Sequence, residues 1–241
     1  MRNPSVPLVI LLSLGGIGLL ATPVAAQSSV SAELINTLNG KLLLVAVPIT
    51  LLIQAIYFYA IVKFRNNDSP VPTQENRRLE ITWTVATAVI LVFVGVASYG
   101  VLANENVTYQ QPSIEQVGNS GADPVEVHVE AYQWGWEMSY PEAGNFSTGT
   151  EIVIPNNRDV VFHITSRDVI HGFHVPKLAL KQDALPGEVQ SVKTKPLETG
   201  TYQGYCSEFC GVSHSQMYFT VEVVSQQEYR DWVESQQESD E

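Results

Sequence analysis

Residues 206–217 read Cys-Ser-Glu-Phe-Cys-Gly-Val-Ser-His-Ser-Gln-Met, and this stretch restricts the fold more than any other part of the 241-residue chain. Two thiols, an imidazole and a thioether occur within twelve residues, at spacings of four, four and three. Soft sulfur ligands combined with imidazole favour copper or zinc over magnesium or calcium. The spacing therefore indicates a loop that wraps around a metal and ends where Met217 points inward on a final strand.

Several interpretations of this loop are open from the residues alone. A structural zinc site would use four Cys or His ligands and has no use for Met217. A mononuclear blue-copper site uses one Cys, two His and a weak Met, which leaves the second Cys without a role. A disulfide between Cys206 and Cys210 fits an oxidising exterior but leaves His214 and Met217 unexplained. Two thiolates, two imidazoles and a thioether suit a pair of copper ions bridged by both sulfurs.

The binuclear interpretation needs a second His from outside the loop. His171 and His174 both lie in the segment 168–176, which we interpret as a turn between strands, and their spacing does not choose between them. His128 and His163 fall within strand patterns, where we expect hydrogen-bonded structural residues.

Short strands are the expected structure on both sides of the loop. Residues 125–129 alternate apolar and polar side chains, and the apolar phase changes at 131–133, which predicts a bulge or bend there. No helical period appears before the acidic tail, 226–241, where we expect a short amphipathic helix. Residues 123–225 are therefore predicted to form an all-β sandwich or barrel. Its further strand patterns are 152–154, 160–164, 187–193, 200–205 and 216–224.

Two uncharged apolar runs, 42–62 and 81–103, precede this region. At a rise of about 1.5 Å per residue, each run makes a helix about as long as the hydrocarbon core of a bilayer is thick, roughly 30 Å. The connecting segment 63–80 carries four basic residues, which places it in the cytoplasm by the positive-inside rule. We therefore predict a transmembrane hairpin over residues 27–103, with both ends facing outward.

Residues 1–26 have the features of a removable secretory signal. Arg2 is followed by an apolar run and then by the small residues 24–26, a pattern that a signal peptidase cuts. A third membrane helix is the alternative, with prolines bracketing its short apolar core. A cleaved leader would deliver the mature N-terminus to the outside, and the C-terminal domain would follow the second helix out through a tether at 104–122.

The chain is acidic, and its charge is unevenly distributed. Lys and Arg number 13 against 25 Asp and Glu, for a net charge of −12, and 45% of the residues are hydrophobic. This composition excludes a disordered chain and argues against nucleic acid, whose phosphates need Lys and Arg. From residue 103 onward, 21 acidic and 7 basic residues give −14. That acidity fits either steering of a basic partner or a very salty exterior, which screens charge within about 3 Å at 1 M salt.

The motifs together closely resemble subunit II of the haem–copper terminal oxidases of the cytochrome c oxidase type. The resemblance covers almost the whole mature chain, and it implies a two-helix hairpin followed by a cupredoxin-like Greek-key barrel. The loop pattern with an upstream Asp-Val-x-His is highly specific to that family. The matching segments are Glu80-Ile-Thr-Trp-Thr84, Gln133-Trp-Gly-Trp136, Asp168-Val-Ile-His171, Leu180-Lys-Gln-Asp-Ala-Leu-Pro-Gly187 and the loop 206–217.

The resemblance also implies a ligand set for a binuclear copper centre, CuA. The carried-over ligands are His171, Cys206, Cys210, His214, Met217 and the backbone carbonyl of Glu208. His174 is then no more than a neighbour of the centre. The family uses the side chain of Glu208 as well, on a magnesium or manganese ion at the interface with subunit I.

Three further residues match family positions with roles. Trp134 matches the aromatic residue that accepts electrons from the donor, although Gly135 stands where many relatives carry another aromatic residue. Asp168 is a candidate for docking a basic donor or for orienting His171. Glu80, at the cytoplasmic edge of the second helix, matches an acid associated with entry to a proton pathway, and an interfacial acid beside Arg77 and Arg78 is the alternative.

The function implied by the resemblance is a one-electron relay in an aerobic respiratory chain. Electrons would come from cytochrome c or a small blue-copper protein and pass to subunit I, which holds the haems and reduces oxygen to water; subunit III is a further expected partner. The implied location is a prokaryotic cell membrane, with the C-terminal domain outside and proton translocation in the complex. Alternatives are a copper-free quinol oxidase subunit, a nitrous oxide reductase and a membrane-anchored blue-copper carrier, each of which fits the ligands, the length or the hairpin less well.

Overall fold

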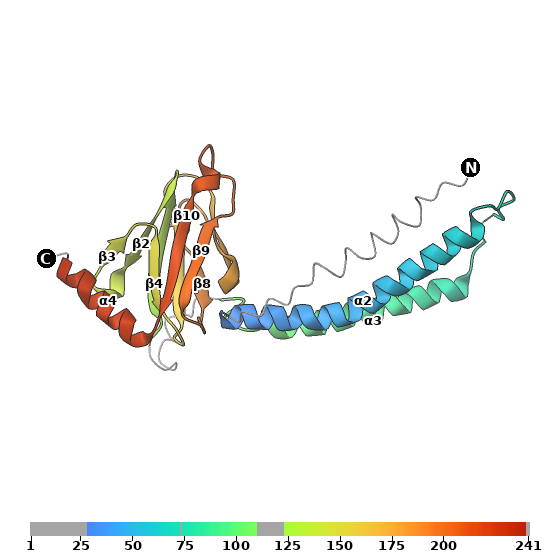
Figure 1. Cartoon of the computed structure of the whole chain (residues 1–241), viewed down its shortest axis with the longest axis horizontal. Helices are drawn as coiled ribbons and strands as arrows, with labels where there is room; N and C mark the ends of the chain where they lie inside the picture. Colours follow the sequence, from blue (N-terminus) through green and yellow to red (C-terminus); the bar gives the residue numbers. More distant parts are fainter. Residues whose placement is uncertain (1–27, 73, 110–122, 240–241) are drawn as a thin grey trace.

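The computed structural model describes residues 28–72, 74–109 and 123–239 (Figure 1). The expected signal peptide, 1–26, lies outside these residues, as does most of the expected tether, 104–122. A long two-helix hairpin is joined at one end to a β-sandwich, and a C-terminal helix lies along the opposite side of the sandwich.

Helices α2 (Val30–Phe64) and α3 (Arg77–Leu102) form the hairpin and lie side by side (Figure 1). Each is long and apolar enough to cross a membrane, and no residue in the most apolar stretch of either helix is buried within the chain. The helix ends follow local chemistry, because the Asn76 side chain accepts a hydrogen bond from the Leu79 N–H at the start of α3. The side chains of these helices are therefore available to lipid or to another subunit.

Helix α2 begins at Val30, well before the expected start at Leu42. Ser29 caps it by accepting a hydrogen bond from the Ala32 N–H at 3.1 Å. Its 35 residues make about 52 Å of helix, more than the roughly 30 Å of a bilayer core. Hydropathy marks only the uncharged part of this helix, 42–62. The preceding turns contain Glu33 and Lys41, so they do not read as apolar, although they belong to the same helix and extend it to the sandwich.

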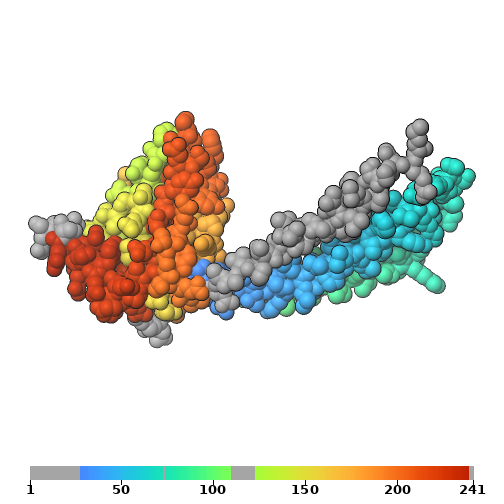
Figure 2. Space-filling view, viewed as in Figure 1, coloured from blue at the N-terminus to red at the C-terminus, as the bar shows by residue number. Residues whose placement is uncertain are grey.

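The first turn of α2 is built into the β-domain (Figure 2). Ser28 donates a hydrogen bond to the Lys177 carbonyl, and Ser29 donates one to the Leu178 carbonyl at 2.7 Å. At the end of the other helix, Glu105 pairs with the buried Lys193 ammonium at 2.9 Å. The two helices are thus attached to the domain by hydrogen bonds and a partly buried ion pair.

The β-domain consists of two five-stranded sheets, in the orders β3-β2-β1-β5-β8 and β4-β10-β9-β6-β7. Strands β1 and β5 are parallel, as are β4 and β10, while the other pairs are antiparallel. The expected all-β sandwich after a two-helix hairpin is confirmed. The strands are β1 (Val125–Tyr132), β2 (Gly135–Tyr140), β3 (Phe146–Thr148), β4 (Glu151–Pro155), β5 (Val160–Ser166), β6 (His171–Val175), β7 (Leu180–Ala184), β8 (Gln190–Thr194), β9 (Gly200–Cys206) and β10 (Tyr218–Val224).

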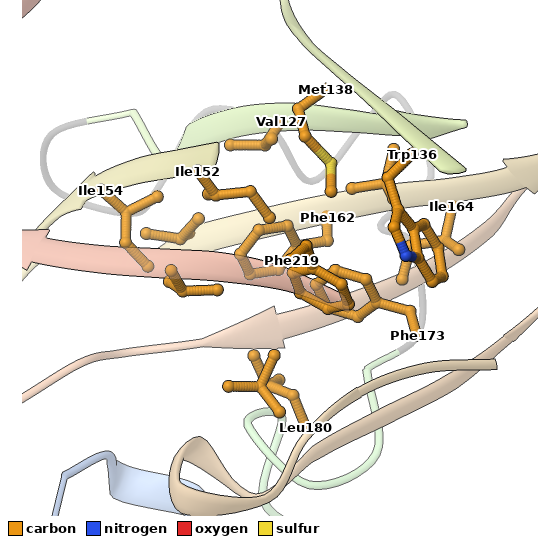
Figure 3. Packing of buried hydrophobic residues seen from close by; sticks show 14 of the residues in the cluster. Val127, Trp136, Met138, Ile152, Ile154, Phe162, Ile164, Phe173, Leu180 and Phe219 are labelled. Atoms are coloured by element: carbon orange, nitrogen blue, oxygen red, sulfur yellow. The ribbon is translucent and has the colours of Figure 1, made fainter. Parts of the chain in front are cut away.

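The core lies between the sheets and is rich in aromatic rings (Figure 3). Trp136, on β2, packs its ring edge-on against Phe219 with centroids 5.0 Å apart, and Phe219 stacks on Phe173 at 4.7 Å. These residues come from alternating strand positions, as the period of two requires. The core also reaches the loop 206–217, because the Trp136 indole nitrogen lies 3.5 Å from the Met217 carbonyl oxygen. The Trp136 ring lies 6.3 Å from that of His171 on β6.

Two sequence interpretations are corrected by the strand pairing. The phase change expected as a bulge or bend at 131–133 is a full reversal of the chain, a hairpin in which Tyr132 of β1 pairs with Gly135 of β2. A reversal of the chain and a bulge change the apolar phase in the same way. The segment expected to be a turn contains strand β6, whose residues are nearly all buried, so it lacks the alternation that reveals a strand.

The acidic tail forms helix α4 (Gln226–Ser239), as expected. Its Trp232 ring lies 5.1 Å from that of Tyr140 and 5.2 Å from that of Phe146. Tyr229 is buried beside it. The helix therefore covers one edge of the sandwich with its apolar face and leaves its acidic side chains in solvent.

Candidate metal centre

The loop between β9 and β10 lies at the end of the sandwich away from the hairpin (Figure 1). Cys206 is the last residue of β9, and Phe173 of the neighbouring β6 pairs with it, so His171 at the start of β6 comes close to the loop. Gly172 allows this approach, since a Cβ there would come within 2.2 Å of the Ser207 hydroxyl. Sheet register thus brings together residues 35 positions apart.

Four side-chain contacts converge at this point. The Cys206 and Cys210 sulfurs are 3.8 Å apart. His171 Nδ1 is 3.8 Å from the Cys206 sulfur, and His214 Nδ1 is 3.7 Å from the Cys210 sulfur. The Met217 sulfur is 3.8 Å from that of Cys210. Each sulfur of the pair therefore has one imidazole beside it, in an arrangement that is nearly symmetric about the two cysteines.

These separations fit ligands that share metal ions. Bonds of about 2.0–2.1 Å to nitrogen and 2.3 Å to sulfur in tetrahedral geometry place two ligands of one metal roughly 3.4–3.8 Å apart. The two cysteines are free, and a disulfide would require their sulfurs to be about 2.05 Å apart. Both thiols face the same centre, so both are placed to act as ligands. A mononuclear blue-copper site would use only one of them.

The centre is nearly dry. His171, Cys206, Cys210 and Met217 are buried, and His214 is partly exposed at the rim. Burial, and then the neighbouring Cys206 thiol, raise the pKa of Cys210 to about 12. Since the thiolate is the metal ligand, a metal must displace this proton, and its binding weakens as the pH falls.

Comparison with known proteins identifies the family. A family model for the periplasmic domain of cytochrome c oxidase subunit II matches residues 137–224, and a model for the transmembrane domain of the same subunit matches 19–101. The cytochrome c oxidase subunit 2 of Cereibacter sphaeroides is 33% identical over 89% of this chain and 77% of its own length. The chain belongs to the cytochrome c oxidase subunit II family.

Another relative agrees with this assignment. A probable cytochrome c oxidase subunit 2 from Rickettsia bellii is 32% identical over 84% of this chain and 79% of its own. Among solved structures, the periplasmic domain of subunit II of cytochrome oxidase from Bradyrhizobium japonicum is 29% identical, with a TM-score of 0.47, and covers 52% of this chain and 99% of that one. This subunit II chain is therefore part of an oxidase, with two membrane helices and a periplasmic domain of the CuA type.

Asp168 holds His171 in place. Its Oδ1 lies 3.0 Å from His171 Nε2, and its Oδ2 accepts a hydrogen bond from the Gln133 N–H at 2.7 Å. Burial raises the Asp168 pKa, but the hydrogen bonds from His171, Gln133 and Val169 outweigh it and lower that pKa below its usual value. The contact with His171 Nε2 is the kind that orients a ligating imidazole, and the Asp168 residue is at the same time exposed to solvent.

Trp134 lies on the other side of the same centre. Its indole Nε1–H donates to the Cys210 carbonyl at 3.2 Å, and Gln133 Nε2 donates to that carbonyl at 2.7 Å. Gly211 makes room for the indole, because a Cβ there would lie 3.2 Å from the ring. The Trp134 side chain is 43% exposed, so it links solvent to a thiol-bearing residue.

Gln133 is a site residue that sequence reasoning missed. It bonds both Asp168 and the Cys210 carbonyl and so joins the two sides of the centre. The sequence signal that could have pointed to Gln133 is its position directly before Trp134.

The other expected site residues differ in how close they come to the sulfur pair. The Glu208 carbonyl is 3.1 Å from the Cys206 sulfur, whereas its side chain points out and lies 3.7 Å from the Lys181 ammonium. His174 faces away from His171 along β6 and packs against the Tyr205 ring at 5.1 Å. Glu80 lies in the first turn of α3, far along the hairpin from the sandwich (Figure 1).

Proposed function

We propose that this subunit accepts electrons one at a time from a soluble donor at a CuA centre and passes them to subunit I. The observation that carries the proposal is the pair of buried thiols 3.8 Å apart, each with an imidazole beside it. When bound, two copper ions would supply the one-electron redox couple. The residues that would hold them are His171, Cys206, Cys210, His214, Met217 and, through its carbonyl, Glu208.

The protein's own contribution is a rigid, dry set of ligands. Asp168 orients the His171 ring, and the Met217 carbonyl accepts the Cys206 N–H at 3.0 Å, which ties the two ends of the loop together. A set of ligands that moves little on a change of charge costs little reorganisation, which is the requirement for fast electron transfer.

Electron entry is assigned to Trp134. Its exposed ring is connected to the Cys210 carbonyl by a hydrogen bond, and the carbonyl is connected to the Cys210 sulfur by covalent bonds. Two apolar side chains of the same loop, Phe209 and Val212, are 82% and 92% exposed. Such a rim suits a donor that docks through apolar contact, either cytochrome c or a small blue-copper protein.

The acidity of the domain is assigned to a saline exterior. A donor that docks through apolar contact needs little long-range electrostatic steering. In a saline exterior, the attraction between the acidic domain and a basic donor would be screened within about 3 Å at 1 M salt. A rate of electron entry that changes little with salt supports this assignment, whereas a steep fall would return the acidity to donor steering.

The remaining roles concern the assembled complex. Subunit I would hold the haems and reduce oxygen to water, with subunit III as a further partner and with proton translocation by the complex. The outward Glu208 carboxylate, released from Lys181, would contribute to a magnesium or manganese ion at the interface with subunit I. Glu80, on the exposed surface of α3, would lie at the entry to a proton pathway.

The proposed location is a prokaryotic cell membrane with the β-domain on the outer face. Residues 1–26 would be a cleaved signal peptide. The buried position of Ser28 and Ser29 in the domain is consistent with a mature chain that starts just before them on the outside.

Copper stoichiometry with electron paramagnetic resonance tests the central proposal on the full-length chain in detergent. We expect two coppers per chain and the hyperfine pattern of one electron shared equally by two nuclei. One copper with a one-nucleus pattern would indicate a blue-copper carrier. No copper, with Cys206 and Cys210 disulfide-linked, would indicate a structural subunit.

A further inference from the structure

A second cluster of ligand-type side chains lies on the outer face of the other sheet. His128 of β1 and His163 of β5 are directly opposite each other on parallel strands, and Glu126 precedes His128 by two residues on the same face. The rings of the two His lie edge to face at 5.0 Å. Ser191 of β8 is opposite His163 on the far side. None of these residues belongs to the sulfur centre described above.

His163 is the member that needs a partner. Its side chain is only 10% exposed, and its Nδ1 lies 3.0 Å from the Ser191 hydroxyl, which fixes the orientation of the ring. Its Nε2 is buried and has no hydrogen-bond partner. Buried polar atoms are paired in the great majority of cases, so an orphaned nitrogen at a fixed position requires an explanation.

That nitrogen points at a carboxylate. Nε2 lies 3.5 Å from Glu126 Oε2, beyond a normal hydrogen bond. In the tautomer that donates from Nδ1 to Ser191, the Nε2 lone pair faces a negative oxygen. A cation between the two would remove this mismatch.

The separation between His163 and Glu126 matches the one that a metal ion imposes on two of its ligands. Ligand atoms of Glu126, His128 and His163 all lie within 4.8 Å of one another. Two nitrogen or oxygen ligands of one tetrahedral ion are roughly 3.4 Å apart, which matches the 3.5 Å between Nε2 of His163 and Oε2 of Glu126. The cluster lines a cavity of about 490 Å³, which leaves room for water as a further ligand.

We propose that Glu126, His128 and His163 form a second metal site, which takes a borderline divalent ion such as Zn²⁺ from the outside. Two imidazoles and one carboxylate suit zinc, whereas magnesium and calcium prefer sites made of oxygen alone. The ion would bridge β1 and β5 and complete the coordination of the orphaned nitrogen. This site lies on the sheet opposite the sulfur centre, and neither proposal depends on the other.

Zinc titration of the full-length chain tests the site. The chain is first loaded with copper and freed of excess metal, and ZnCl₂ is then added while bound zinc is measured by calorimetry and by metal analysis. We expect one zinc per chain. Because loss of an outer-shell partner alone weakens metal binding about 10–100-fold, loss of a direct ligand in His128→Ala is expected to weaken it by about 100-fold or more. His128 is exposed, so this substitution leaves the core intact.

Matched variants control for surface binding. His174→Ala removes another imidazole and Glu151→Gln another strand carboxylate, and both should bind zinc as the unmodified chain does. Glu126→Gln should weaken binding as His128→Ala does. Circular dichroism reports on folding in every variant. No zinc uptake by the unmodified chain, zinc affinity unchanged in His128→Ala, or affinity lost in His174→Ala would each overturn the proposal.

Discussion

The two clusters of histidine differ in how the chain assembles them. At the sulfur centre, four of the side chains come from one twelve-residue loop, and only His171 comes from elsewhere. The second cluster has no motif, since His163 joins Glu126 and His128 only through the pairing of β1 with β5. A site concentrated in one loop can be recognised in a sequence, whereas a site made by strand register is visible only in the fold.

Their surroundings differ as well. At the sulfur centre, His171 has a carboxylate behind its ring, and the loop backbone is tied to Gln133 and Trp134. In the second cluster the Ser191 hydroxyl plays the corresponding part behind His163. We therefore expect the sulfur centre to bind its copper tightly. We expect the second cluster to release and rebind its own metal ion from solvent more readily.

Substitution of one of the two paired thiols should have the largest effect. Cys210→Ser removes a contact to three neighbouring ligands, because His214, Met217 and Cys206 all approach the Cys210 sulfur. We expect loss of the two-copper signal and of oxygen consumption with a soluble donor, with copper content falling to one per chain or less. Ser215→Ala, at an exposed position of the same loop, is the control. An intact two-copper signal in Cys210→Ser would contradict the bridged arrangement.

Loss of the carboxylate behind His171 should have a smaller effect. Asp168→Asn preserves size but weakens the bond to Nε2, and changes of this kind cost about 10–100-fold in metal affinity. Competition with a copper chelator measures the change, and Asp183→Asn on neighbouring β7 is the control. Unchanged copper retention, with weaker donor binding instead, would return Asp168 to a docking role.

Electron entry should be altered without loss of copper in Trp134→Phe. The ring stays aromatic but loses its hydrogen bond to the Cys210 carbonyl, and with it the proposed connection to the centre, so we expect slower reduction of the centre. The lost bond should cost the fold only about 1 kcal/mol. Stopped-flow reduction by cytochrome c gives the rate, and Trp232→Phe in α4 is the comparison. Equal rates in the two variants would exclude Trp134 as the entry point.

The smallest effect is expected at the second cluster. His128→Ala should leave the copper content and the electron-transfer rate within error of the unmodified chain, because no contact joins the cluster to the sulfur centre among the described residues. The same optical and stopped-flow measurements apply. A change in either quantity would show that the two clusters are coupled through the sandwich.

The sequence alone was enough for the hairpin and for most of the sulfur centre. Uncharged runs as long as a bilayer is thick have few other structures, so the two helices follow from local composition. The start of α2 at Val30 could not be predicted from local composition. The first turns of this helix are held by hydrogen bonds of Ser28 and Ser29 to the β-domain. Local hydropathy carries no information about a partner almost 150 residues away.

The choice between His171 and His174 required the resemblance at the level of sequence, and the fold gives its physical reason. Side chains alternate along β6, so His171 shares the inward face with Phe173 while His174 lies on the other face beside Tyr205. The contact of Trp134 with Cys210 and the orphaned nitrogen of His163 likewise exist only because strands distant in sequence pair in one register. Ligand types are a property of the residues themselves, but which of them meet is fixed by backbone hydrogen bonds between strands, and these are not encoded in any local stretch of the chain.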